Sequence, residues 1–316
     1  ISNGLSGGYS TYEQSAGTLS EILVPASREP LSLIQAGLQL LGDPIDMVQG
    51  HFLYNHEDLN VGVGSFPQSL SFQRLYSSGL RNQNGPLGRG WTHNFNASAA
   101  LNSDGFQAMG EDSALDAVGT LVEHKASFDL LMDPARPLAK LVTATLGQRW
   151  FGDQLIDNTV VVTQGLNGEV FVKLPDGSYN PPPGKAAWLT KNTDGSYSYE
   201  TLHRAVLKFS TAGKPESYTE PSGVQAKFTY SGNDLTQVQN SLGRTLTFTN
   251  ASGRITQVGD GARSVSFSYD ANANLATFTN TLGQGTTFSY ALPGQIKSIY
   301  NPALPTTAAL TNTYDS

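Results

Sequence analysis

The side chains best suited to acid–base or metal chemistry in this 316-residue chain are its histidines, His51, His56, His93, His124 and His203. His51 and His56 are five residues apart on an expected strand. Because successive strand side chains alternate between faces, these two are predicted to point to opposite faces and not to share a metal ion. The other three are scattered, and an isolated histidine is usually structural or on the surface.

Paired acidic residues are the second group that could do chemistry. They occur at Glu57 and Asp58 and at Asp43 and Asp46, beside expected turns, where acids usually are solvated or accept backbone N–H groups. Residues 4–8 fit Gly-x-Ser-x-Gly, but they lie in a Gly- and Ser-rich lead-in with no expected strand before them, so no nucleophile elbow is predicted. The glycine-rich residues 85–90 match neither a phosphate-binding loop nor a dinucleotide fingerprint. We therefore predict no catalytic, cofactor-binding or metal-binding residues, no cofactor, and a protein that is not an enzyme.

Composition and charge exclude further classes. Charged residues make up 14% of the chain, against about 25% in average soluble domains, and Ser, Thr, Asn and Gly replace them. This favours a β-rich, turn-rich protein. A net charge of −7 argues against nucleic acid or an anionic membrane as a partner. Cysteine is absent, and no apolar run reaches the roughly 18 residues of a membrane-spanning helix. The start at Ile1 suggests a fragment or a processed product.

The strongest pattern is a repeat of about twenty residues between positions 223 and 300. Each copy has a phenylalanine, then a tyrosine or asparagine two residues later, and then two apolar residues three positions apart. The four copies are Phe228, Tyr230, Leu235 and Val238; Phe248, Asn250, Ile255 and Val258; Phe267, Tyr269, Leu275 and Phe278; and Phe288, Tyr290, Ile296 and Ile299. Gly, Asn and Asp fill the gaps, so each copy predicts two short strands and two turns.

The two halves of each copy fit a strand differently. Residues 265–269 alternate between apolar and polar side chains, as in a strand with one covered face. The apolar pair would lie on opposite faces of a flat strand, and either a β-bulge or a strand contacted on both faces would reconcile this. One hairpin cannot bury its own face, so neighbouring copies are expected to form a continuous sheet. We expect its open edge after Asn301.

A second signature lies at residues 43–96. Asp43-Pro44 leads into an expected strand that ends at Asp58-Leu59, and a second strand over residues 70–78 places Leu70, Phe72 and Arg74 on one face. Residues 85–95 then read Gly-Pro-Leu-Gly-Arg-Gly-Trp-Thr-His-Asn-Phe. The three glycines predict a tight loop that lets a strand start close to another backbone, with Trp91 buried.

These two signatures resemble the Rhs proteins. Residues 267–270 (Phe-Ser-Tyr-Asp) with Asn274-Leu275, and residues 248–250 with residues 253–255, are similar to the YD repeat, and residues 314–316 look like the opening of one more copy. The Asp-Pro start, the Arg-x-Tyr-Ser-Ser strand and the glycine–tryptophan motif are similar to the front of many Rhs proteins. The resemblance covers roughly residues 43–100 and 165–316. It implies a long β-sheet that spirals into a hollow shell.

Helical spacing interrupts this β pattern. Apolar residues follow it over residues 112–131 and again over residues 138–156, on either side of Asp133-Pro134. We predict an αα-hairpin insert, either a cover for an open sheet face or edge or a plug or docking element for a partner. Beyond it, Asn167-Gly168, Asp176-Gly177 and Asp194-Gly195 predict hairpin turns.

The predicted fold is mainly β: antiparallel hairpin repeats that form the start of a spiralling β-sheet shell, with the inserted αα-hairpin. The regions are a lead-in with a short helix (1–42), a β module that resembles the Rhs front (43–110, here the front module), the helical hairpin insert (111–158), β-hairpins with degenerate repeats (159–222) and a truncated YD-repeat array (223–316).

Three functions remain open. The resemblance implies a non-catalytic part of a secreted or cell-surface bacterial shell that encloses and helps to deliver a C-terminal effector or toxin. Its partners would be the rest of the shell, that effector, and secretion-system components or glycans. The alternative is a cell-surface adhesion or carbohydrate-binding YD-repeat protein, which could use Tyr230 and Tyr269. A third is a hydrolase within the helical insert. The acidic residues with which many Rhs proteins cleave themselves have no counterpart in this sequence.

Overall fold

The computed structural model describes residues 50–103, 157–174 and 176–314, with isolated positions between residues 122 and 145. Within these ranges the chain is built from antiparallel β-sheets, which confirms the predicted mainly β fold. The isolated positions Val122, Lys125, Leu138, Leu141, Val142 and Thr145 have helical backbone. The predicted αα-hairpin as a whole, the lead-in helix, and His124, Asp43 and Asp46 lie outside the described residues. No helix among the described residues is long and apolar enough to cross a membrane.

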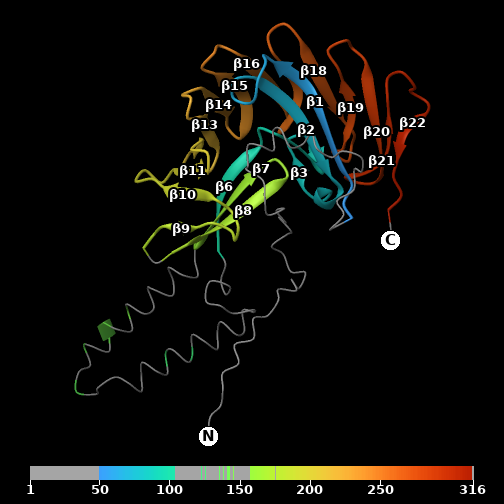
Figure 1. Cartoon of the computed structure of the whole chain (residues 1–316). Helices are drawn as coiled ribbons and strands as arrows, with labels where there is room; N and C mark the ends of the chain where they lie inside the picture. Colours follow the sequence, from blue (N-terminus) through green and yellow to red (C-terminus); the bar gives the residue numbers. More distant parts are fainter. Residues whose placement is uncertain are drawn as a thin grey trace.

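The largest sheet has 13 strands that follow one another in sequence order, each antiparallel to the next. Its strands are β10 (Ala187–Lys191), β11 (Tyr197–Thr201), β12 (Val206–Phe209), β13 (Pro215–Thr219), β14 (Gln225–Ser231), β15 (Asp234–Asn240), β16 (Thr245–Ala251), β17 (Arg254–Gly259), β18 (Ser264–Tyr269), β19 (Leu275–Thr279), β20 (Gly285–Leu292), β21 (Gln295–Tyr300) and β22 (Ala308–Thr311). Figure 1 shows it as an arc from β10 to β22. We call it the repeat sheet.

The expected sheet edge after Asn301 is wrong by one strand. After a loop, β22 pairs with β21, with Leu310 opposite Ile299 and Ala308 opposite Tyr300. Leu310 is half-buried and packs against the core, which gives this short strand an apolar contact with it. The sheet also begins earlier than the clear repeats, at Ala187, because the degenerate segments before Gly223 pair in the same way.

A β-bulge in each repeat hairpin explains the apolar pairs. In the first copy Thr229 pairs with Gln237 and Tyr230 with Leu235, so Thr236 is the extra residue. The same shift occurs in the other three copies. The extra residue moves the second apolar side chain back to the face of the first, and Leu235 and Val238 are both buried. Of the two explanations left open by the sequence, the bulge is confirmed.

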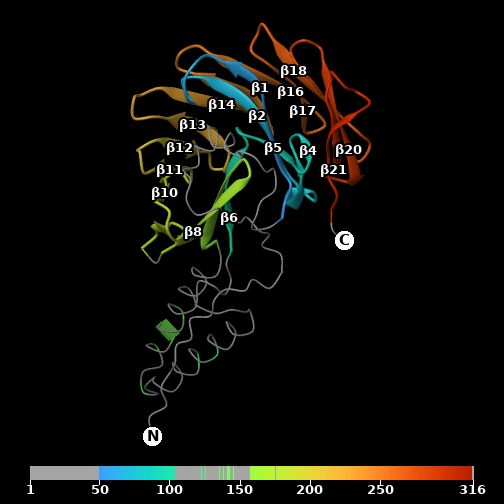
Figure 2. The same cartoon turned by 45° about the vertical axis from the view of Figure 1, so that its right-hand side comes forward.

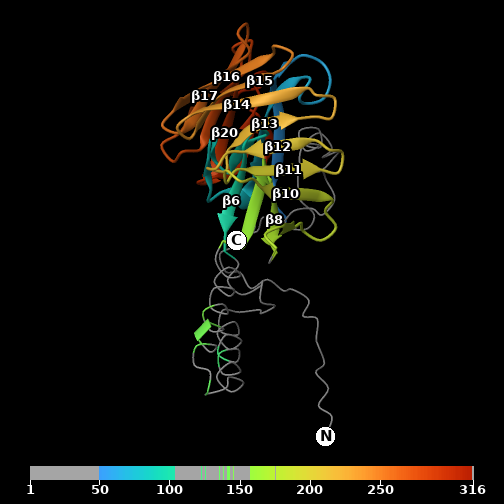
Figure 3. The ribbon, with the colours of Figure 1, turned by 90° about the vertical axis from the view of Figure 1, so that its left-hand side faces the viewer.

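Two smaller sheets and one short pair complete the described fold. The first sheet has the order β1-β2-β5, with β1 (Leu53–Val61), β2 (Leu70–Ser77) and β5 (Trp91–His93). The second contains β6 (Ala97–Asn102), β7 (Thr159–Gln164), β8 (Asn167–Lys173) and β9 (Tyr179–Asn180), in sequence order. A 3-10 turn (Ser78–Leu80) and the short pair β3 (Asn84–Gly85) and β4 (Gly88–Arg89) follow β2. Figure 2 shows β1, β2 and β5 along the inner side of the arc, and Figure 3 views the molecule from the side of β10–β14.

Two local predictions need correction. Asn167 and Gly168 lie within β8, and the turn that precedes them is made by Gly165, whose φ of 58° suits a glycine. The other two predicted hairpin turns, at Asp176-Gly177 and Asp194-Gly195, are confirmed. His51 lies just before β1 and not on it, so the argument from alternating strand faces does not apply to it.

The front module and the repeat sheet share one hydrophobic core. Buried side chains of β1, β2 and β5 and buried side chains of the repeats belong to a single cluster. Phe72, Leu70 and Trp91 contribute from the front module, and Leu246 and Leu275 from the repeats. Each layer therefore depends on the other to remove its apolar face from water.

Candidate functional site

The candidate functional site is the interface between the front module and the concave face of the repeat sheet. Each of the four repeated phenylalanines meets an aromatic ring of the front module there. The pairs and their centroid separations are Phe95 with Phe228 (6.3 Å), Phe72 with Phe248 (5.7 Å), Phe72 with Phe267 (5.9 Å) and Trp91 with Phe288 (5.1 Å). The sequence repeat therefore builds an inner face on which the front module is seated.

The glycine-rich loop docks on the turns at one edge of the repeat sheet. We call this edge rim A; it is formed by the turns between β14 and β15, β16 and β17, β18 and β19, and β20 and β21. Ile255 donates its N–H to the carbonyl of Pro86 at 2.9 Å, and Arg89 donates its N–H to the carbonyl of Ala273 at 3.1 Å. Gly88 has a φ of +93°, and a Cβ there would lie 2.5 Å from the carbonyl oxygen of Ala273. The predicted close approach of this loop to another backbone is confirmed.

Tyr76 and Trp91 hold the fourth repeat at the same rim. The Tyr76 hydroxyl donates to the carbonyl of Gly294 at 2.8 Å and accepts from the N–H of Ile296 at 3.1 Å. Trp91 donates its indole N–H to the Tyr290 hydroxyl at 3.0 Å. Burial raises the pKa of Tyr76 and of Tyr290 far above the usual value of a phenol, so both hydroxyls remain protonated donors.

The turn between β1 and β2 docks on the opposite edge, rim B, which carries the turns between β13 and β14, β15 and β16, β17 and β18, and β19 and β20. Asn240 donates its side-chain N–H to the carbonyls of Pro67 at 2.8 Å and Gln68 at 2.9 Å. Gln68 in turn donates to the carboxylate of Glu220 at 2.6 Å, and Arg263 donates to a carbonyl of β1 at 2.8 Å. The front module thus spans the concave face and is held at both rims.

From the second copy onward, a tyrosine or asparagine ties each repeat to the one before it. The acceptor is always a main-chain carbonyl at the bulge of the preceding copy, which the bulge removes from regular pairing. The bonds run from Asn250 to Leu235 (2.8 Å), from Tyr269 to Ile255 (2.5 Å), from Tyr290 to Leu275 (2.8 Å) and from Tyr314 to Ile296 (2.8 Å). Tyr314 therefore takes the place of the tyrosine in a further copy, as its sequence predicts.

These ties lead to a modest and specific stability prediction. Tyr290→Phe is expected to lower the free energy of unfolding by about 1–2 kcal/mol, because the hydrogen bond is lost and the carbonyl of Leu275 keeps no such donor. Urea unfolding followed by circular dichroism measures this loss. Tyr300→Phe is the matched control, since its hydroxyl makes no hydrogen bond to the described residues. Equal effects of the two variants would contradict a role for the tie.

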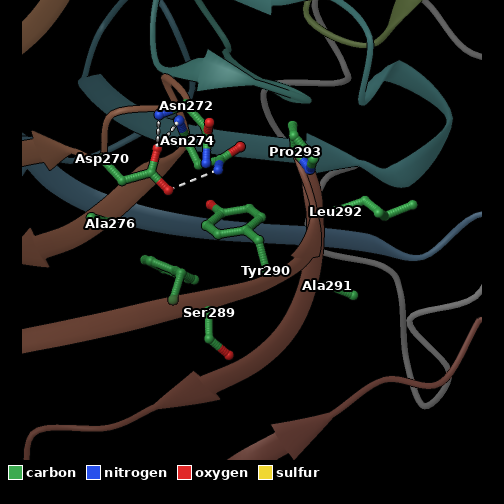
Figure 4. A pocket seen from close by; sticks show the side chains of 10 residues that line it. Asp270, Asn272, Asn274, Ala276, Ser289, Tyr290, Ala291, Leu292 and Pro293 are labelled. Carbon is green, nitrogen blue, oxygen red and sulfur yellow. Dashed lines mark hydrogen bonds between the residues drawn. The ribbon is translucent and has the colours of Figure 1, made fainter.

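The aspartate of the YD motif shapes a turn. Asp270 accepts the N–H groups of Asn272 and Asn274 with one carboxylate oxygen, both at 2.9 Å, and the side-chain N–H of Asn274 with the other at 2.8 Å. Figure 4 shows this cluster beside the ring of Tyr290, at a small cavity of about 240 Å³. The carboxylate oxygens are occupied by N–H donors, so the turn is self-contained. The described part of the chain holds no group of three or more His, Asp or Glu side chains placed to bind a metal.

One acidic residue lies where the sequence did not place it. Asp58 was expected to be solvated or to cap a backbone group, but its side chain is fully buried and paired with that of Arg74, with N–O distances of 2.5 and 2.9 Å. The Arg74 guanidinium also lies 4.0 Å from the ring centroid of Phe278. His56 completes the group, with its Nδ1 at 2.7 Å from Asp58. The sequence did contain one signal for this buried pair: Arg74 lies on the apolar face of an alternating strand.

The remaining candidate residues are apart from this group. Glu57 accepts the hydroxyl of Ser71 at 2.6 Å and is exposed, while His203 lies on an exposed turn between β11 and β12. His93 is buried beside Phe72, with 5.5 Å between ring centroids. The described histidines and acids are thus spread over separate environments, apart from His56 and Asp58.

His93 makes the stability of the fold depend on pH. Burial lowers the pKa of His93 to about 3, whereas an unfolded histidine titrates near 6.5. Between these values the unfolded chain binds a proton that the folded chain does not, so the free energy of unfolding falls as the pH drops below about 6.5, by up to about 1.4 kcal/mol per pH unit.

Urea unfolding at several pH values between 6.5 and 4.5 tests this dependence. The variant His93→Phe is expected to remove most of the slope, and the exposed control His203→Gln is expected to keep it. An unchanged slope in His93→Phe would show that other groups cause the acid sensitivity.

Comparisons with known proteins agree with part of this picture. Residues 42–115 match a family model described as "Domain of unknown function (DUF6531)", which contains the front module predicted at residues 43–110. No curated protein matches the chain. Among solved structures, the chain is similar to one described as "Crystal Structure of TcdB2-TccC3-Cdc42", with 12% identity and a TM-score of 0.30. That alignment covers 45% of this chain and 10% of the other. The family match and the β-rich repeat fold fit an Rhs- or YD-type protein, weakly and without establishing one.

Proposed function

We propose that this chain is a non-catalytic wall segment of an Rhs-type β-shell, which encloses a C-terminal effector polypeptide and helps to deliver it. The observation that supports the proposal most is the seating of the front module across the concave face of the repeat sheet. The 13-stranded sheet has an apolar concave face that must be buried. The front module buries it, and aromatic contacts and hydrogen bonds at both rims fix the front module there. The front module would thereby set the curvature with which the wall begins.

The repeat mechanism fits a wall that grows by addition. Each copy brings a phenylalanine for the inner face and a bulge that exposes a carbonyl, and from the second copy onward a tyrosine or asparagine binds the carbonyl of the preceding copy. Nothing in this scheme requires a reacting group. The partners we propose are therefore further wall of the same shell and the polypeptide that it encloses, with secretion or display at the cell surface as the setting.

Cryo-electron microscopy of the full-length gene product tests this function. We expect a closed particle with an interior that holds polypeptide density, and the arc of β10–β22 as part of its wall. A rod or a solid particle without an interior would contradict the proposal.

No observation favours the carbohydrate-binding alternative at the tyrosines first considered for it. Tyr269 is partly buried, and its hydroxyl is bound to the carbonyl of Ile255. The Lys214 ammonium lies 5.5 Å from the ring centroid of Tyr230, and burial raises the pKa of Tyr230 well above its usual range. The ammonium of Lys214 therefore lies against the Tyr230 ring, and the Tyr269 hydroxyl is already engaged within the protein.

A further inference from the structure

A second, larger cavity lies outside the interface described above. It has a volume of about 630 Å³ and lies between β1 and the end of the repeat sheet at rim B, where β19 turns into β20 and β21 leads into β22. Its lining includes His56, Phe278, Asn280, Gln284, Asn301 and Pro302. The volume is within the range of about 300–1,000 Å³ of ligand pockets.

His56 is held in one orientation at the wall of this cavity. Its Nδ1 lies 2.7 Å from Asp58, whose side chain is fully buried and bound in turn by Arg74. A carboxylate can only accept, so Nδ1 carries a proton, and in the neutral ring Nε2 is then an acceptor on the opposite side. The His56 side chain is 46% exposed, and it lines the cavity. A buried ion pair thus positions one hydrogen-bond acceptor toward an open space.

The rest of the lining is uncharged. Asn280, Gln284 and Asn301 supply carboxamides, which carry the same donor and acceptor groups as a peptide unit. Asn280 is committed to its own turn, because its oxygen accepts the N–H groups of Leu282 and Gln284 at 2.9 Å and its N–H donates to Gln284 at 3.1 Å. The side-chain N–H of Gln284 and the carboxamide of Asn301 therefore face the ligand. Sugar sites need an open aromatic face, but Phe278 is 4% exposed and has the Arg74 guanidinium 4.0 Å from its centroid. The chemistry of the lining therefore favours a peptide over a saccharide.

The neighbouring strand also suits a peptide. Among the described strands, β1 pairs only with β2, so it forms the edge of its sheet beside this cavity. An edge strand offers main-chain donors and acceptors to a segment that lies along it.

We propose that this cavity binds an uncharged, extended peptide segment, with a donor of the peptide on Nε2 of His56 and its peptide groups on the carboxamides of Gln284 and Asn301. The site goes beyond the proposed wall function, because a wall needs no ligand. A shell can form without this site, and the site can bind without a shell, so the two proposals fail in different experiments.

The test is a titration of the whole chain with a pool of N-acetylated, C-amidated tetrapeptides made of Gly, Ala, Ser, Thr and Asn. Long-range ¹H–¹⁵N NMR spectra of the histidine rings report Nε2 of His56 directly. We expect a saturable shift of this signal while the signals of His93 and His203 stay unchanged. Isothermal titration calorimetry measures the affinity of the variants. We expect His56→Ala to weaken binding at least tenfold. His56→Gln, which keeps an acceptor, is expected to weaken binding less than His56→Ala does.

A second cavity variant, a variant outside the cavity and a check of the fold complete the test. Asn301→Ala is expected to weaken binding severalfold, whereas His203→Ala, outside the cavity, is expected to leave it unchanged. Unaltered His93 signals in each variant show that the fold is intact. The proposal is overturned if no pool member shifts His56, if a pool of Lys and Glu tetrapeptides binds equally well, or if tri-N-acetylglucosamine shifts His56 and the peptides do not.

Discussion

Asp58→Ala is expected to lower the free energy of unfolding by about 3–5 kcal/mol, the largest effect expected of a polar substitution among the described residues. The side chains of Asp58 and Arg74 are both fully buried. Arg74 lies among the rings of Trp91 and Phe278, at 5.4 and 4.0 Å from their centroids. Without Asp58, the guanidinium keeps its charge in an apolar environment that cannot solvate it, and this penalty produces the loss.

Urea unfolding followed by far-UV circular dichroism measures the effect, and a double variant provides the control. Asp58→Leu combined with Arg74→Met removes both charges and is expected to recover much of the loss, because no unpaired charge remains buried. A single variant that unfolds at the same urea concentration as the unchanged chain would contradict the assignment of this pair. So would a double variant that is no more stable than Asp58→Ala.

Trp91→Ala is the second large effect, with an expected loss of about 3–5 kcal/mol. Trp91 is 2% exposed, and its ring centroid lies 5.1 Å from those of both Tyr76 and Phe288. Its indole N–H also donates to Tyr290, so the substitution leaves a cavity and removes a bond across the interface. The loss is expected to reach the repeat sheet as well as the front module.

Trp188→Ala is the matched control for Trp91. Trp188 lies on β10 and is 49% exposed, so its removal is expected to change the free energy of unfolding by less than about 1 kcal/mol. The measurement is again urea unfolding, with the amides of β20 and β21 observed by NMR. If Trp91→Ala unfolds the front module while β20 and β21 stay intact, the two layers do not share their stability.

Local sequence signals were sufficient to predict the strands of the repeats and the close approach of one loop. Phenylalanines and tyrosines at alternate positions, separated by Gly, Asn and Asp, predicted the hairpins of β14–β21, because each hairpin is built from neighbouring residues. The glycine spacing at residues 85–90 predicted a close backbone approach, which Gly88 and Ala273 make. The apolar pairs three residues apart were the sequence signal for the bulge. Periodicity alone could not distinguish a bulge from a strand that is contacted on both faces.

The site itself depends on contacts between residues far apart in the chain. Tyr76 and Gly294 are 218 positions apart, and nothing in the local sequence of either indicates the other. The buried pair of Asp58 and Arg74 was missed for a related reason: Asp58 follows an exposed glutamate near a predicted turn, and only the strand opposite it supplies the arginine. The seating of the front module on the concave face could therefore not be predicted from composition or spacing.

The central claim is that the front module and the repeat sheet form one cooperative layered unit. Native-state amide hydrogen exchange tests it most directly, because it reports the opening free energy of each strand separately. We predict that the most protected amides of β1, β2 and β5 and those of β16–β21 exchange with one common free energy, and that Trp91→Ala lowers it equally in both sets. Exchange of the front module at a lower free energy, with the repeats unaffected by Trp91→Ala, would contradict the account.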